Sequence, residues 1–451
     1  MAGVENPGFG HSSLGPTGPW DILIIGAGWA GVSAALRAAE AGHRVALIEA
    51  SRQLGGRARS LPAFRYREQD LRLDNGQHLL MGAYSETLGL MQKVGIEAHN
   101  VLLDVGLDLR LPNGQGLALP AEVSSWPSKW LMAMSIFNAS GWSWRERLGM
   151  LSWGLQWQRR HMQCSPESSV ADLCANLPAR LIHEWIEPLC VSALNVPPSR
   201  ASGQLFLNAL ADTVFADQTQ WRGLIPRVPL DEVFPSAATS WLCERGHAVY
   251  LGQRASSLQR TGEGWIVNGA LRASHVVLAL PAPAAADLAK QVEHPAAQAW
   301  AACASSLEHT AIATVYLHTN QKRGAKLMQA LPTAHPWDAQ FVFDWERLGR
   351  AHGVLAAVLS HATGNADELG QHVCAQVKSA LGLSELNLIK SVVEKRATFA
   401  AKPAVKRPPS EVAPRLWACG DYIEGRYPAT IEGAVRSAAR IPWRQLRGRS
   451  N

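Results

Sequence analysis

The 451-residue sequence contains no uninterrupted apolar run of about 18 residues, the length that a membrane-spanning helix needs. Its first twenty residues lack the basic-then-apolar order of a signal peptide and are rich in Gly, Pro and Ser, so we expect residues 1–18 to be a disordered leader. The seven cysteines are scattered and never form a Cys-x-x-Cys pair. This pattern argues against a disulfide framework or a zinc site and fits a reducing cytoplasm.

Charge is also scarce and nearly balanced. Charged residues make up 18% of the chain, and the net charge of +6 is spread along it, which favours an anionic surface but does not indicate nucleic-acid binding. Hydrophobic residues make up 47%, which excludes intrinsic disorder and leaves ample material for a core.

The first ordered segment has the pattern of a βαβ unit. An apolar run over residues 21–25 indicates a buried parallel strand, and apolar residues at helical spacing over 32–39 predict a helix that stops at Gly42. Residues 44–49 (R-V-A-L-I-E) predict the second strand. Further strand patterns over 247–251, 275–280 and 416–419, and a last helix over 431–438, follow much later in the chain.

These strand-rich pieces lie at the start, middle and end of the chain, separated by two long stretches of mixed pattern. We therefore predict an α/β fold in which one Rossmann-type dinucleotide-binding domain is assembled from residues 19–84, 236–289 and 396–451. A second, mixed α+β domain for the substrate, residues 85–235 and 290–395, is inserted twice.

The glycine-rich turn after the first strand predicts a pyrophosphate site. Gly26-Ala27-Gly28-Trp29-Ala30-Gly31 matches G-x-G-x-x-G between a strand and a helix, and Glu49 ends the next strand. Gly26 permits the tight turn, Gly28 lets a pyrophosphate reach the backbone at the helix N-terminus, and Gly31 allows close helix–strand packing. Glu49 is expected to accept hydrogen bonds from ribose hydroxyls. The cofactor-binding residues predicted here are Gly26, Gly28, Trp29, Ala30, Gly31 and Glu49.

Two further patterns extend the predicted cofactor site. Gly55-Gly56-Arg57 leaves the backbone open and offers a planar cation to a phosphate or a flavin edge. Near the C-terminus, Gly420-Asp421 follows a strand, and a helix starting near Ala429, Thr430 and Ile431 would direct its positive N-terminus at the flavin. Asp421 is expected to bind the ribityl chain or to order the pyrophosphate.

Together these motifs resemble flavin amine oxidases and carotenoid desaturases, whose FAD-binding, Rossmann-type (GR2-like) fold the chain is expected to share. Three stretches are similar to the squalene-associated FAD-dependent desaturases, also called hydroxysqualene dehydroxylases. They are Leu73–Tyr84 (LDNGQHLLMGAY), residues 188–198 with Pro-Leu-Cys and Ala-Leu-Asn, and Tyr427–Ser437 (YPATIEGAVRS). The match is weak over about residues 100–165.

The resemblance also implies roles for individual residues. The loop of Asp74, Asn75, Gly76, Gln77 and His78 is expected to pass beside the flavin ring, with Asn75 and Gly76 contacting the cofactor and Gln77 and His78 near the reacting carbon. His78 has an ordinary pKa near about 6.5 and is the predicted proton donor, although it could instead simply hydrogen-bond the backbone or flavin. The backbone of Ala255 is expected at the adenine. For Asn195, a structural turn is favoured over substrate contact.

Six of the 17 tryptophans fall within residues 126–157, next to several Lys and Arg residues. Aromatic and basic side chains together suit a membrane interface, but tryptophans lining a core or a substrate cavity explain the pattern equally well. The first alternative predicts a protein attached peripherally to the inner face of the cytoplasmic membrane.

The resemblance implies that the protein uses non-covalent FAD and no metal to reduce hydroxysqualene, a polyprenyl lipid, to squalene in hopanoid biosynthesis. The allylic hydroxyl would leave as water after protonation by His78 or by a water near the flavin, hydride would come from reduced FAD, and an electron donor not yet identified would reduce the flavin. A carotenoid- or squalene-type desaturase running hydride in the opposite direction is the alternative enzyme. A flavin-fold protein that only carries polyprenyl lipids is the non-enzymatic alternative.

Overall fold

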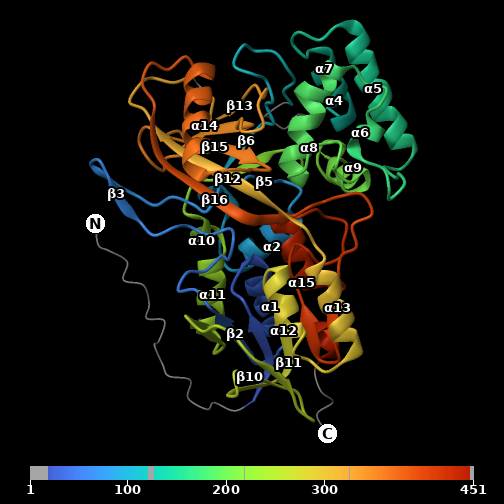
Figure 1. The fold of residues 1–451 in the computed structure, drawn as a ribbon, viewed down its shortest axis with the longest axis vertical. Coiled ribbons are helices and arrows are strands. Elements are labelled where there is room, and N and C mark those ends of the chain that lie inside the picture. Colours follow the sequence, from blue (N-terminus) through green and yellow to red (C-terminus); the bar gives the residue numbers. More distant parts are fainter. Residues whose placement is uncertain (1–18, 120–125, 218, 325, 447–451) are drawn as a thin grey trace.

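The computed structural model describes residues 19–119, 126–217, 219–324 and 326–446, and the expected leader at residues 1–18 lies outside this part. An eight-stranded sheet occupies the lower half of the molecule, a five-stranded sheet with one covering helix the upper left, and a group of helices the upper right (Figure 1). No helix in the described ranges is both long and apolar enough to cross a membrane.

The lower sheet is mostly parallel and joins strands from three distant chain segments. Its order is β17-β18-β11-β1-β2-β8, with β10 and β9 added beside β11. The bounds are β1 Trp20–Ile25, β2 Val45–Glu49, β8 Ala248–Leu251, β9 Leu258–Arg260, β10 Trp265–Val267, β11 Leu271–Leu278, β17 Glu411–Ala413 and β18 Leu416–Ala418. The strands expected from the apolar runs are therefore confirmed, and they lie side by side.

Helices cover both faces of this sheet, which explains why its strands are apolar without alternation. Ile22 and Ile24 of β1 share a core with α1, α11 and α15, whereas Leu23 and Ile25 share one with α12 and α13. The helices are α1 Trp29–Glu40, α2 Ser85–Lys93, α11 Pro235–Glu244, α12 Ala282–Ala289, α13 Pro295–Ser305 and α15 Ile431–Ala439. Because α13 packs against α12 and β17, the chain stays with this layer past residue 289, where we expected the boundary.

The upper sheet is antiparallel, in the order β13-β14-β15-β12-β16, and α14 packs on β12 and β16. Its elements are β12 His309–His318, β13 Met328–Ala330, β14 Phe341–Asp344, β15 Val354–Ser360, α14 Ala366–Ala380 and β16 Asn387–Phe399. Small sheets join it to the lower half: β3 Phe64–Tyr66 with β4 Gln69–Leu71, and β5 Leu80–Met81 and β6 Leu102–Val105 on either side of β7 Gly223–Pro226.

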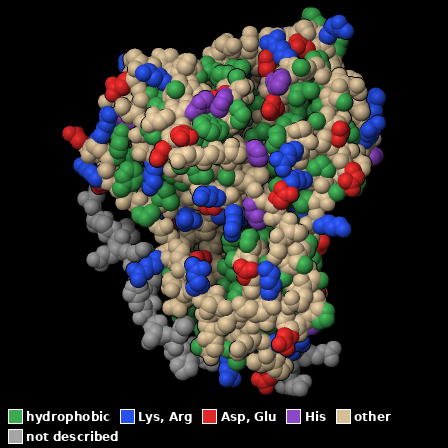
Figure 2. All heavy atoms as spheres, viewed as in Figure 1, with side chains coloured by type: hydrophobic (Ala, Val, Ile, Leu, Met, Phe, Trp, Pro, Cys, Tyr) green, Lys and Arg blue, Asp and Glu red, His purple; other side chains and the backbone are tan. Residues whose placement is uncertain are grey.

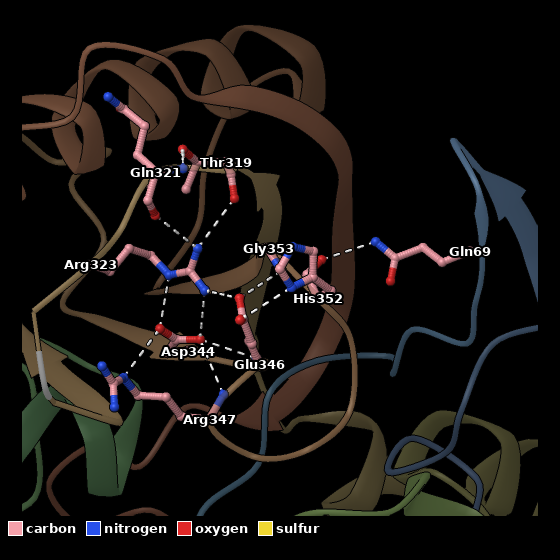
Figure 3. Close-up of polar contacts among 9 residues, drawn as sticks. All are labelled: Gln69, Thr319, Gln321, Arg323, Asp344, Glu346, Arg347, His352 and Gly353. Carbon is pink, nitrogen blue, oxygen red and sulfur yellow. Dashed lines mark hydrogen bonds and ion pairs between the residues drawn. The ribbon is translucent and has the colours of Figure 1, made fainter.

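An ion network built on buried Asp344 fixes the connections at one end of the upper sheet (Figure 3). The Arg323 guanidinium donates to Asp344 at 2.9 Å and to Glu346 at 2.5 Å. Gln69, from the β3–β4 hairpin, donates to the backbone oxygen of His352 at 2.9 Å. The network ties the hairpin to the β14–β15 connection, and since its charges are paired we assign it a structural role.

The helices at upper right are α4 Ser128–Phe137, α5 Trp144–Arg159, α6 Val170–Leu173, α7 Ala179–Leu181, the π-helix Ile182–Ile186, α8 Glu187–Leu194 and α9 Gly203–Asp212. Short helices α3 Ala98–Val101 and α10 Leu230–Val233 and a 3₁₀ turn Trp443–Gln445 complete the fold.

The tryptophan-rich stretch divides evenly between the two expected environments. Trp126, Trp130 and Trp144 are 55–65% exposed, and the other three, Trp142, Trp153 and Trp157, are at most 6% exposed. The stretch therefore supplies both a core and an exposed aromatic surface.

Candidate active site

A cavity of about 900 Å³ lies between the carboxyl ends of the parallel strands and the upper sheet. Its wall includes most of the predicted site residues: Gly26, Gly28, Trp29, Ala30, Glu49, Gly55, Gly56, Arg57, Asn75, Gly76, Gln77, His78, Gly420, Asp421, Ala429, Thr430 and Ile431. This is the edge of an open α/β sheet at which ligands bind. Residues more than 300 positions apart in the chain thus meet around one space.

Each glycine of the first turn is explained by a different structural requirement. A Cβ on Gly31 would lie 1.8 Å from the Gly26 carbonyl oxygen, and one on Gly26 would lie 2.4 Å from the Ala279 carbonyl oxygen, so neither position tolerates a side chain. Gly31 faces this contact rather than the cavity. Gly28 has ordinary backbone angles, and a Cβ there would be 3.7 Å from the Cα of Gly56, a normal contact. Gly28 and Gly56 therefore form a side-chain-free cradle at the start of α1.

The N-terminus of α1 is suited to an anion. Its N-cap is Gly28, which offers no side-chain acceptor, and its first turn contains no acidic residue. The first N–H groups of the helix therefore have no capping side chain, while Gly28, Trp29 and Ala30 line the cavity. A helix N-terminus beside a glycine cradle fits the pyrophosphate of a dinucleotide.

Glu49 lines the cavity at the end of β2. One carboxylate oxygen accepts the Ala27 N–H at 2.7 Å and the other accepts the Ser51 N–H at 2.8 Å. These bonds fix the plane of the carboxylate and leave further lone pairs for two ribose hydroxyls. The residue expected at the adenine, Ala255, instead lines a smaller neighbouring cavity of about 70 Å³, and Arg254 borders both cavities.

Arg57 and Asp421 line the cavity but bind each other in an ion pair, which sequence reasoning did not foresee. Arg57 also donates to the Ala397 carbonyl at 2.6 Å. Burial alone would lower the pKa of Arg57, but the charge of Asp421 and its hydrogen bond outweigh burial, so the pKa is raised. The guanidinium is thus a fixed cation in the cavity wall, and its contact with a cofactor stays a prediction.

The N-terminus of α15 also faces the cavity. Thr430 caps it by accepting the Gly433 N–H at 3.0 Å. Glu432, the acidic residue of its first turn, is fully buried and accepts hydrogen bonds from the Glu86 and Thr87 N–H groups at the start of α2. Glu432 also pairs with Arg436 at 2.7 Å. Its charge is therefore committed to the α2 N–H groups and to Arg436, and the positive end of the α15 dipole remains available to an electron-rich ring in the cavity.

The loop of residues 74–78 is anchored by the buried carboxylate of Asp74. Asp74 is 2% exposed, pairs with Arg350 and accepts the Ser60 hydroxyl at 2.7 Å. The Tyr316 hydroxyl donates to the Asp74 carbonyl at 2.9 Å. These contacts fix the position of residues 75–78 in the cavity wall.

Gln77 and Asn75 are oriented by neighbours. The Gln77 side-chain oxygen accepts the indole N–H of buried Trp345 at 2.7 Å. Asn75 donates to the Arg57 carbonyl at 3.0 Å and to Glu394 at 3.1 Å. Both amides therefore position the loop, and Gln77 has no acidic proton to supply.

His78 is held in its neutral form. Burial lowers its pKa from the ordinary value, and the Arg57 charge adds to this effect, while the Gly76 carbonyl and Asp74 oppose it. Its Nδ1 lies 3.0 Å from the Gly76 carbonyl oxygen, which can only accept, so Nδ1 carries the proton. In neutral His78, Nε2 is then an acceptor, and donation from Nε2 requires a pH below the lowered pKa.

Tyr427 is a cavity residue whose chemistry sequence reasoning missed. Burial, followed by the charge of Asp212, raises the pKa of Tyr427 to about 12, so its phenol is neutral and able to donate at neutral pH. Arg426 binds Asp212 through two nitrogens at 2.8 and 3.1 Å. Tyr427 directly precedes the Pro428–Ile431 pattern, but its partner lies 215 residues earlier in the chain, so spacing gave no signal.

Beyond the 74–78 loop the cavity becomes apolar. This apolar arm is lined by side chains from the segment after β6, from α8, from α9 and the residues just after it, and from the upper sheet: Leu107, Leu109, Leu189, Ala193, Phe206, Leu210, Val214, Met328, Phe341, Phe343 and Val358. Asn195 also borders the cavity, but its side chain donates to Thr310 at 2.7 Å and accepts the His361 N–H at 2.7 Å. Asn195 has a φ of 53° and is 2% exposed, consistent with the expected turn role.

Comparisons with known proteins agree with this geometry. The family model for flavin containing amine oxidoreductase matches residues 29–441. Hydroxysqualene dehydroxylase of Rhodopseudomonas palustris is 28% identical over 93% of this chain and 96% of its own length. A 15-cis-phytoene desaturase of Capsicum annuum is 31% identical over 29% of this chain and 25% of its own.

Among solved structures, an oxidoreductase from Methanosarcina mazei has a TM-score of 0.69 at 15% identity, covering 93% of this chain and 99% of its own, which supports the fold. Because the family model spans most of the sequence, and because the predicted glycine turns meet at one cavity, the chain belongs to the flavin-containing amine oxidoreductase family and is an oxidoreductase.

Proposed function

We propose that the cavity holds non-covalent FAD and that the enzyme reduces hydroxysqualene to squalene, as a step of hopanoid biosynthesis. The observation that carries the proposal is the continuity of one cavity from the α1 cradle, past the 74–78 loop, into an apolar arm. The cradle fits a dinucleotide and the arm fits a long hydrocarbon, so their junction is where a flavin ring and a polyprenyl carbon would meet. The relatives named hydroxysqualene dehydroxylase support this substrate.

The reaction replaces a hydroxyl by hydrogen, and reduced FAD supplies the hydride. The substrate C–O bond breaks, the hydroxyl takes up a proton and leaves as water, and hydride takes its place on carbon. The apolar arm holds the chain and excludes bulk water from the cation that develops. His78 or Tyr427 supplies the proton, and the α15 N-terminus stabilises negative charge on the cofactor side.

We propose that the chain divides into an FAD-binding domain and a substrate domain. Residues 19–84, 236–305 and 396–451 would form the FAD-binding domain, and residues 85–235 and 306–395 the substrate domain. The five parallel strands β1, β2, β8, β11 and β18 support the first unit, and the contacts of α13 support moving its second boundary from 289 to 305.

The purified protein's absorbance spectrum tests the proposal. We expect a flavin spectrum, complete release of the colour on acid precipitation, bleaching by dithionite, and anaerobic reoxidation by hydroxysqualene with squalene as product. A coloured pellet would contradict non-covalent binding. Oxidation of squalene or phytoene by the oxidised enzyme, without turnover of hydroxysqualene, would establish the desaturase alternative that the phytoene desaturase match favours.

Glu49→Ala should weaken FAD binding by roughly 1.5–3 kcal/mol, the contribution of a hydrogen bond to a charged group. The physical reason is the loss of a carboxylate already oriented by the Ala27 and Ser51 N–H groups. Flavin released on dilution, followed by fluorescence, measures the effect. Glu263→Ala, at an exposed carboxylate away from the cavity, is the control and should leave binding unchanged. Equal affinity in both variants would remove Glu49 from the site.

We also propose that the exposed surface of α4 and α5 binds the inner face of the cytoplasmic membrane. Its exposed apolar side chains, here called the α4–α5 ridge, are Trp126, Trp130, Met134, Phe137, Trp144, Leu148 and Leu155. Lys129, Arg145, Arg159 and Arg160 are exposed beside them. A ridge of indoles with flanking cations matches the chemistry of an anionic lipid interface.

The double substitution Trp130→Ser/Trp144→Ser should reduce binding to vesicles containing anionic lipid by on the order of a hundredfold or more, because each indole buried in the lipid interface contributes roughly 1.5–3 kcal/mol. Co-sedimentation measures the effect, and 1 M salt, with a Debye length of about 3 Å, should weaken binding of the parent. Trp241→Ser, at a partly buried indole on α11 outside the ridge, is the control. Loss of flavin in the double variant, or unchanged vesicle binding, would contradict the proposal.

A further inference from the structure

A second polar cluster lies away from the cavity, where the loop between β13 and β14 meets α14. It consists of His335, Asp338 and His372, and one potential ligand atom from each lies within 4.8 Å of the others. Nε2 of His372 lies 2.8 Å from a carboxylate oxygen of Asp338. Figure 2 shows histidine side chains together on the surface of the upper part of the molecule, over the region of β13 and α14.

The carboxylate is oriented before any ligand arrives. One oxygen of Asp338 accepts the backbone N–H groups of Ala334 and His335, each at 2.7 Å, which leaves the other oxygen facing His372. Asp338 is 8% exposed. The two N–H groups therefore hold the carboxylate in place, nearly buried, on one side of the cluster.

An indole supports the two imidazoles. The Trp337 ring lies edge-on to His335 and His372, with ring centroids 5.7 and 6.2 Å apart. Gly364, with a φ of 95°, makes room for it, because a Cβ there would lie 2.9 Å from the indole. The His335 Nδ1 accepts the backbone N–H of Trp337 at 3.1 Å. Because His335 is exposed, it is the ligand best able to adjust.

We propose that His335, Asp338 and His372 bind a divalent transition-metal ion, with Zn²⁺ the best fit. Two imidazoles and one carboxylate are typical zinc ligands, and three protein ligands leave a fourth position to water at this exposed site. The metal would replace the proton shared by Asp338 and His372. Sequence spacing indicated no zinc site, because His372 lies 34 residues after Asp338 and no cysteine takes part.

The metal would act on the cavity through the loop. Met328 and Phe341, near the two ends of the β13–β14 connection, line the apolar arm, and His335 and Asp338 lie between them in sequence. A bound ion would hold the loop on α14 and stiffen that part of the wall. This role is structural and does not depend on the reaction proposed above.

Zinc titration of the chelator-treated, untagged full-length protein, in competition with a chromophoric chelator, tests the proposal. We expect one Zn²⁺ per chain and a rise in melting temperature on adding Zn²⁺, because the ion binds the folded state. His335→Ala and His372→Asn should weaken binding by at least about tenfold, the scale reached even by changes around a metal site. His372→Asn retains an amide that can donate to Asp338, so the loop contact can persist.

His352→Ala is the matched control. His352 is also exposed and lies 3.1 Å from a carboxylate, that of Glu346, but no third ligand accompanies it in the described structure (Figure 3). The flavin content of every variant reports that the fold is intact. Absence of zinc binding in the parent, or equal affinity in His335→Ala and the parent, would overturn the proposal and leave the cluster as a loop contact.

Discussion

Gly28→Val yields a folded protein without FAD. The backbone of Gly28 has a φ of −72° and a ψ of 176°, which any residue adopts, and a Cβ there meets Gly56 at a normal 3.7 Å. The two γ-methyl groups, however, would occupy the cradle in front of the α1 N-terminus. Overpacking of about 1–3 kcal/mol together with lost helix–anion contacts of up to about 2 kcal/mol weakens binding by up to about 5 kcal/mol. This corresponds to a factor of up to about 10³–10⁴.

The measurement is flavin content after purification, with circular dichroism and thermal unfolding as checks on the fold. Gly28→Ala should retain flavin with reduced affinity, because it adds only the tolerated Cβ. Gly31→Ala should fail to fold, because its Cβ would lie 1.8 Å from the Gly26 carbonyl oxygen. A Gly28→Val protein that purifies with one flavin per chain would show that the pyrophosphate does not lie in this cradle.

The parallel sheet and its turns could be predicted because their signals are local. The apolar run of β1, the helical spacing of α1 and the glycines between them lie within about twenty residues, and each follows from steric or burial requirements at that point. The layer to which α13 belongs, just beyond the expected boundary at residue 289, could not be predicted, because an amphipathic helix has the same sequence pattern whichever layer it covers. Only its contacts with α12 and β17 reveal its place.

Side-chain pairing across the site could not be predicted. Arg57 and Asp421 are 364 residues apart, and each alone has the character of a phosphate or ribityl ligand. Their ion pair forms only when the first and last pieces of the chain meet. Trp142 is buried and Trp144 is exposed, although only two positions separate them in the sequence. The difference arises because they lie at the boundary between the loop and α5.

The substrate hydroxyl needs a proton to leave as water, and His78 is the predicted donor. His78→Phe should keep FAD and still be reduced by dithionite, since no structural contact of the cofactor cradle involves the imidazole ring. Reoxidation by hydroxysqualene in single-turnover experiments should slow by about 10²–10⁴-fold, the contribution of general acid catalysis. Because burial lowers the pKa of His78, the protonated donor is scarce at neutral pH. The parent rate should therefore rise as pH falls below neutrality and level off below the lowered pKa, and this acid limb should vanish in His78→Phe.

Tyr427→Phe separates this role from the other donor in the cavity wall. The phenol of Tyr427, with its pKa raised to about 12, stays protonated from acid to moderately alkaline pH, so catalysis by Tyr427 would show no acid limb in that range. If His78 is the donor, Tyr427→Phe should retain most of the rate and the full pH profile. A parental rate in His78→Phe, together with a flat profile and a large loss in Tyr427→Phe, would transfer the role to Tyr427 and leave His78 as a neutral group that holds the loop through Gly76.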